Sequence, residues 1–187
     1  GPIPSGDSIY FGSFGTEINT FGGALTVTES DPIANLATVM LQVEIGEAYT
    51  YDFYDGIDYA SLPVLTLNYG DSQTITMAAT FTEKVMALYN GTVEMPTGPG
   101  GSMQDEDIFV NLWGFQYDVS GYDDITSYSL EFGAVEHAQL YALQLDQSDI
   151  SYGSSMIPVP EPSTWAFGLG IATLLFASLR RRRAASA

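Results

Sequence analysis

Acidic side chains around a glycine are the first residues of this chain whose spacing could do chemistry. Asp52, Asp55 and Asp58 fall within seven residues, next to Gly56, which permits a tight bend. Calcium takes about six to eight oxygen ligands, which loop carboxylates and carbonyls supply. The residue order of an EF-hand loop is missing, however. Calcium binding by these three aspartates and a solvated acidic turn are both open interpretations, and no other cofactor is expected.

Two further acidic groups follow, at 105–107 and at 123–124. The residue types that most enzymes use are scarce, because the chain has no cysteine and a single histidine, His137. The lack of cysteine excludes thiol catalysis, zinc–thiolate sites and disulfides. One imidazole does not build the usual zinc site, and a Gly-x-Ser-x-Gly elbow is absent. We therefore expect that the protein is not an enzyme.

Aromatic side chains recur at every second position in one segment. Trp113, Phe115 and Tyr117 would lie on one face of a strand. Such a row is either a platform on which sugar rings stack or the core face of a β-sandwich. The core face is the more frequent case, and both interpretations remain open here.

The C-terminal thirty residues have an order of their own. They begin with a polar motif at 159–164, which consists of Val159, Pro160, Glu161, Pro162, Ser163 and Thr164. An uncharged apolar stretch covers residues 165–179, and it is closed by a basic stop at 180–183, made of Arg180, Arg181, Arg182 and Arg183. At ~1.5 Å per residue the stretch spans roughly 22 Å, against about 30 Å of hydrocarbon. Interfacial Trp165 and the long arginine stems compensate for this length, and we predict a transmembrane helix over 165–179.

The charge distribution predicts the orientation of this helix. Four of the five basic residues are the arginines of the stop, which places the stop in the cytoplasm and residues 1–160 across the membrane. The first residues, Gly1 to Pro4, do not form a charged segment followed by an apolar run, as an export signal would. We therefore expect a chain that is already processed or that begins with residues added in cloning.

The polar motif, the short apolar helix and the terminal arginines, taken together, resemble the PEP-CTERM sorting signal, over about residues 158–183. The four residues that follow the arginines are a minor departure. The resemblance implies recognition by an exosortase, a membrane-embedded cysteine peptidase-like enzyme of Gram-negative bacteria. It also implies transient anchoring in the inner membrane, removal of the tail and delivery to the cell surface, commonly together with extracellular polysaccharide.

The rest of the chain is strongly acidic. Residues 1–157 hold 22 acidic side chains against Lys84 alone, a net charge of −21. A body so charged repels nucleic acid, so no nucleic-acid partner is expected. Abundant aromatic and apolar residues argue against disorder, and about 155 residues suffice for one domain with a core.

The body alternates short β-type runs with turn residues, which predicts an all-β ectodomain, a β-sandwich or jelly roll. The expected strands are 9–11, 25–28, 39–45, 49–54, 64–69, 74–81, 85–89, 108–119, 127–132 and 139–145. Asn90-Gly91 predicts a tight turn, and residues 96–102, rich in proline and glycine, predict a loop. We divide the chain into an ectodomain at 1–147, a linker at 148–158 and the sorting signal at 159–187.

These observations predict an exported, non-enzymatic protein of the cell surface or extracellular matrix. Its partners would be the processing enzyme, extracellular polysaccharide or copies of itself, the last through exposed strand edges. A carbohydrate-binding module or a calcium-binding, adhesin-like domain is the alternative.

Overall fold

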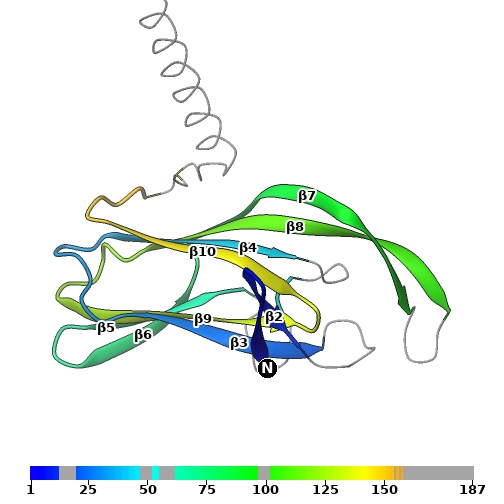
Figure 1. Cartoon of the computed structure of the whole chain (residues 1–187). Helices are drawn as coiled ribbons and strands as arrows, with labels where there is room; N and C mark the ends of the chain where they lie inside the picture. The colour runs from blue at the N-terminus through cyan, green and yellow to red at the C-terminus, as the bar shows by residue number, and fades with distance from the viewer. Residues whose placement is uncertain are drawn as a thin grey trace, which may run out of the picture. The chain divides into compact units, whose positions relative to one another are not determined.

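The computed structural model of this chain describes residues 1–12, 20–46, 52–54, 62–96, 102–153, 155 and 157. The chain divides into two compact units, residues 1–157 and residues 158–187, and every described residue belongs to the first. The described part is all-β and consists of two sheets (Figure 1). The predicted transmembrane helix at 165–179 lies outside the described residues.

Six strands form the first sheet, and each pairs antiparallel with its neighbours. Their order across the sheet is β1 (Pro2–Ser5), β2 (Ser8–Phe11), β10 (Gln139–Ser148), β4 (Thr38–Gly46), β8 (Met103–Asp118) and β7 (Phe81–Pro96). The second sheet, also antiparallel, has the order β3 (Phe21–Glu29), β9 (Ile125–Val135), β5 (Val64–Tyr69) and β6 (Gln73–Ala78).

The two sheets share one apolar core, as the alternation of residues along the strands requires. In β4, every second residue is fully buried: Val39, Leu41, Val43 and Ile45. The second sheet contributes Leu65, Leu67 and Leu130 to the same cluster. The predicted all-β class with two layers is therefore confirmed (Figure 1).

Strands β7 and β8 extend beyond the rest of the first sheet. The pairing of β4 with β8 stops at Gly46 and Val110, whereas β7 and β8 stay paired as far as Pro96 and Met103. The two-stranded ribbon formed by residues 89–96 and 103–109, here called the arm, projects past the sandwich (Figure 1). Tyr89 and Phe109 pair across it, with ring centroids 5.8 Å apart, and both are exposed.

The predicted turn at Asn90-Gly91 is wrong. Both residues lie inside the sixteen-residue strand β7, at a register shift between Tyr89 and Thr92. Gly91 has a φ of 108°, which a residue with a side chain rarely adopts. The dipeptide therefore makes a β-bulge at the base of the arm, because a positive-φ glycine suits a bulge as well as a turn.

Nine of the ten expected strands coincide with strands β2 to β10 or lie largely within them, apart from the run at 49–54. Of that run only residues 52–54 are described, and Phe53 makes a single β-bridge with Ala134. Strand β1 was not predicted. The described residues of the predicted linker hydrogen-bond to the first sheet: Ile150 accepts from Thr38 at 2.8 Å, and Ile157 donates to Gln116 at 2.8 Å.

The same substitution, leucine to alanine, at one buried and one exposed position tests the location of the core. Leu67→Ala should lower the free energy of unfolding by about 3 kcal/mol, because Leu67 is fully buried and its loss leaves a cavity. Leu88→Ala, on an exposed part of β7, should change it by less than about 0.5 kcal/mol. Urea unfolding of both variants gives the comparison, and equal losses would contradict the assigned core.

Candidate functional site

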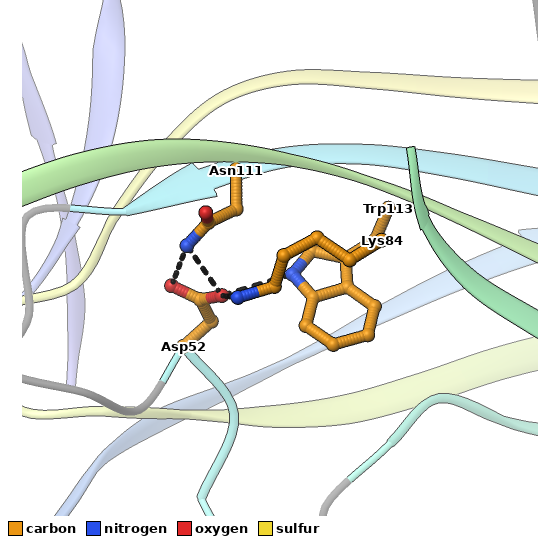
Figure 2. Close-up of polar contacts among 4 residues, drawn as sticks. All are labelled: Asp52, Lys84, Asn111 and Trp113. Atoms are coloured by element: carbon orange, nitrogen blue, oxygen red, sulfur yellow. Dashed lines mark hydrogen bonds and ion pairs between the residues drawn. The ribbon is translucent and has the colours of Figure 1, made fainter. Parts of the chain in front are cut away.

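A buried carboxylate is the most elaborate polar site of the described residues (Figure 2). Asp52 is 7% exposed and follows β4 along the chain. Asn111 donates through Nδ2 to both carboxylate oxygens of Asp52, at 2.9 and 2.8 Å. Trp113 donates through Nε1 to Oδ2 of Asp52 at 2.9 Å, and the same oxygen lies 3.8 Å from Nζ of Lys84.

Strand geometry explains why these side chains meet. Asn111 and Trp113 are alternate residues of β8, on the face that carries Phe115 and Tyr117 into the core. Lys84 lies directly opposite Trp113 on β7, so its side chain projects from the same face. The backbone carbonyl of Asp52 accepts a hydrogen bond from Val135 of β9 at 3.4 Å, which ties the carboxylate to the second sheet.

Aromatic rings surround the carboxylate and the lysine. Nζ of Lys84 lies 4.9 Å from the centroid of the Trp113 ring, a cation–π arrangement. Phe53 meets Trp113 edge to face at 5.7 Å, and Trp113 stacks on Phe115 at 6.0 Å. Among the three aromatic residues of the predicted row, Phe115 and Tyr117 are fully buried, whereas Trp113 is half-buried and bound to Asp52. The core interpretation therefore holds for this row.

Burial raises the pKa of the Asp52 carboxyl above its ordinary 3.8, because the charged form loses its water. The hydrogen bonds from Trp113 and Asn111, and the charge of Lys84, lower this pKa and offset part of the rise. The site thus holds a carboxyl that takes up a proton more readily than a solvated aspartate, beside an amine and a carboxamide.

The structure places only one of the three predicted calcium ligands, because Asp55 and Asp58 lie outside the described residues. Asp52 already accepts three hydrogen bonds, and within the described residues no group of three or more His, Cys, Asp or Glu side chains could hold a metal ion. Calcium binding by Asp52, Asp55 and Asp58 stays a prediction.

His137 lies in the turn between β9 and β10, with a φ of 68°. Its Nδ1 hydrogen-bonds to the hydroxyl of Tyr10, and its backbone N–H donates to Phe11 at 2.9 Å. Both contacts fasten β2 to this turn, which is a structural role. Burial, and then the charge of Glu136, raise the pKa of Tyr10.

A polar cavity lies where the loops after β3 and after β8 meet. Its volume is about 690 Å³, and its polar lining consists of Asn35, Ser120, Tyr122, Asp123 and Asp124. The two loops are joined by a hydrogen bond from the Val119 N–H to the Ala37 carbonyl at 2.9 Å. The acidic pair at 123–124, named above as a further acidic group, therefore opens onto a cavity.

The sequence interpretation missed Lys84 and Asn111. Two signals were available: Lys84 is the single lysine of the chain, and Asn111 is a polar residue on an otherwise aromatic face. The site joins Asp52 to two side chains that are distant in sequence: Lys84 comes 32 positions later and Asn111 comes 59 positions later. Only the pairing of the strands reveals that they meet.

A family model for the PEP-CTERM protein-sorting motif matches residues 158–183. No curated protein and no solved structure matches the chain. The chain therefore carries a PEP-CTERM sorting motif attached to an all-β body of two sheets. It is an exported protein that an exosortase-type enzyme sorts to the surface of a Gram-negative cell.

The motif residues 159–164 and the basic stop 180–183 lie outside the described residues. Among the residues that the structure describes, no helix is long and apolar enough to cross a membrane.

Asp52→Asn tests the buried carboxylate. The asparagine side chain has the same shape, but an NH2 group replaces one of the two carboxylate oxygens. This NH2 group would face the N–H donors of Asn111 and Trp113, so the free energy of unfolding should fall by about 2 kcal/mol. Asp7→Asn, in the exposed turn between β1 and β2, is the matched control and should change little. Urea unfolding measures both, and an equally stable Asp52→Asn variant would contradict the role given to these hydrogen bonds.

The pH dependence of that loss follows from the raised pKa. The folded chain binds the Asp52 proton more tightly than the unfolded chain does. The stability that this group adds is therefore fully present below the ordinary pKa of 3.8, which applies to the unfolded chain. The added stability is lost as the pH rises through the folded-state pKa. The difference between wild type and Asp52→Asn should therefore be larger at about pH 4 than at about pH 7. A larger difference at neutral pH would show that the pKa is lowered instead.

Proposed function

We propose that this chain is a non-enzymatic protein of the cell surface or extracellular matrix, held briefly in the inner membrane and then released by exosortase processing. The single observation that supports the proposal most is the sorting motif at 158–183, joined to a body of net charge −21. A polymer-rich surface layer is hydrated and ionic, and a strongly acidic domain stays soluble in it.

The arm and the edge of β7 support a role in association. Tyr89 is 60% exposed, and Val93, Met103 and Phe109 are exposed beside it. Strand β7 is an edge of the first sheet, so its outer N–H and C=O groups have no neighbouring strand among the described residues. A long edge strand whose ribbon exposes several apolar side chains among acidic ones suits association with a second copy or with an extracellular polymer.

Replacing Pro160, Glu161 and Pro162 by alanine tests the sorting role. In the native cell the wild-type chain should lose the residues beyond about Pro162, whereas the variant should keep its tail and stay in the inner-membrane fraction. Mass spectrometry of the mature C-terminus measures this. Ser186→Ala, beyond the arginines, is the control and should be processed normally. A triple variant that is processed like wild type would refute the proposal.

Carbohydrate binding is the second candidate function, and the polar cavity favours it. Sugars are bound in concave sites by hydrogen bonds from carboxylate, amide and hydroxyl groups beside an aromatic ring. The cavity offers Asn35, Ser120, Asp123 and Asp124, with Tyr122, whose ring is packed edge to face on Tyr69 at 4.9 Å. The cavity, rather than the Trp113 row, is therefore the place where a sugar would bind.

Asn35→Gly combined with Asp123→Ala tests this second function. Glycine keeps the positive φ of Asn35, which is 57°, so the loop should retain its conformation. Loss of two hydrogen-bonding groups should weaken binding of the exopolysaccharide from the native cell by at least about tenfold in calorimetry. Asp7→Ala is the control, on the exposed β1–β2 turn. Unchanged binding in the double variant would exclude the cavity.

A further inference from the structure

We infer that Lys84 and Asn111 become joined by an intramolecular amide cross-link, formed between Nζ of Lys84 and Cγ of Asn111, with Asp52 as the group that transfers the proton. The inference rests on the geometry of the buried site and goes beyond the proposed function. The product would be a covalent bond between two neighbouring strands of an exported protein.

The contacts of Asp52 bring the two reacting side chains to one carboxylate oxygen. Its Oδ2 atom lies 2.8 Å from Nδ2 of Asn111 and 3.8 Å from Nζ of Lys84, so one carboxylate oxygen contacts both the leaving nitrogen and the attacking nitrogen (Figure 2). Proximity of this kind replaces an encounter in solution. Lys84 and Asn111 also project from the same face of β7 and β8, because Lys84 pairs with Trp113 and Asn111 comes two residues before Trp113 on β8.

The carboxyl and the carboxamide at this site are both withdrawn from water. Asn111 and Asp52 are each 7% exposed, and Phe53 packs against Trp113 beside them. Burial raises the pKa of the Asp52 carboxyl, so it accepts a proton from the neighbouring ammonium more readily than a solvated carboxylate does. The Lys84 side chain is 41% exposed, which leaves a path by which ammonia departs.

The reaction balances without an oxidant or a second substrate. The Lys84 ammonium gives a proton to Asp52, and its neutral amine attacks Cγ of Asn111, so that the Nζ–Cγ bond forms. The Cγ–Nδ2 bond then breaks, and the proton that Nζ loses passes through Asp52 to Nδ2, which leaves as ammonia. The ammonia takes up the remaining proton and departs as ammonium, which returns Asp52 to its carboxylate form. Nothing is oxidised or reduced.

The composition adds an independent argument. The chain has 22 acidic residues before position 158 and one lysine, and that lysine lies beside a buried carboxylate that contacts a carboxamide. An exported chain without cysteine has no disulfide to brace an edge strand. A link between Lys84 and Asn111 would close a loop that contains the whole arm and would hold β7 onto β8 at its base.

Intact-mass spectrometry of the folded full-length chain tests the inference. Wild type should be lighter than the mass calculated from its observed termini by one ammonia, about 17 Da. Digestion with chymotrypsin should release a branched peptide that joins position 84 to position 111. Asn90-Gly91 can also lose ammonia, by forming a cyclic imide, so the branched peptide and the variants decide between the two sources.

Three variants complete the test. Lys84→Arg keeps the positive charge and the stacking on Trp113, so it should fold, as far-ultraviolet circular dichroism checks, and it should have its full calculated mass. Asn111→Ala should also have its full mass, and Asp52→Asn should react at least tenfold more slowly. The inference is overturned by a wild-type chain of full mass, or by an ammonia loss that is equally large in wild type and in Lys84→Arg. Loss of water with a branch at Asp52 would overturn the assignment to Asn111, and normal cross-linking in Asp52→Asn would remove the role of Asp52.

Discussion

The apolar contact between the two sheets has to hold this protein together against its own charge. Residues 1–157 carry 22 carboxyl groups and one lysine, and the chain has no cysteine. Like charges on one surface repel each other and destabilise the compact state. The opposing force is burial of the continuous core that Val39, Leu41, Val43 and Ile45 of β4 share with the second sheet. Strand β4 lies between β10 and β8, near the middle of its sheet, and thus carries the most completely buried face.

The single lysine sits at the margin of the core, with its side chain 41% exposed and its amine beside the buried Asp52. Lys84 compensates a carboxylate that three hydrogen bonds already hold, and it does so at the base of the arm. A lysine paired with a carboxylate on the fully exposed surface would be screened by salt and would contribute little to stability. At Asp52 the same charge lies beside a carboxylate that is itself withdrawn from water, and the contact links the edge strand β7, the inner strand β8 and the segment that follows β4. The arm, which offers exposed apolar side chains for association, therefore projects from a well-fastened base.

Much of the fold was predictable because the strands have strong local patterns. Val64–Tyr69 was predicted to the residue, since its alternation is bounded by proline on one side and Asn68-Tyr69-Gly70-Asp71 on the other. Strand β1 was not predicted, because Pro2 and Pro4 lower the expectation of a strand. Both prolines are tolerated here because β1 is an edge strand of its sheet. The turn predicted at Asn90-Gly91 is a bulge instead, since a bulge and a turn use the same glycine conformation.

The site around Asp52 depends on partners far apart in sequence, which local pattern does not reveal. The sorting motif was fully readable because it is a contiguous segment, and the family model confirmed it.

The dependence of stability on salt tests the central claim most directly. Raising sodium chloride from about 0.01 M to about 0.3 M shortens the Debye length from roughly 30 Å to less than 8 Å and screens repulsion between surface carboxylates. If an apolar core opposes unbalanced negative charge, the melting temperature should rise steadily across this range. A melting temperature that falls as salt is added would contradict the account, since it would mean that attraction between opposite charges holds the fold.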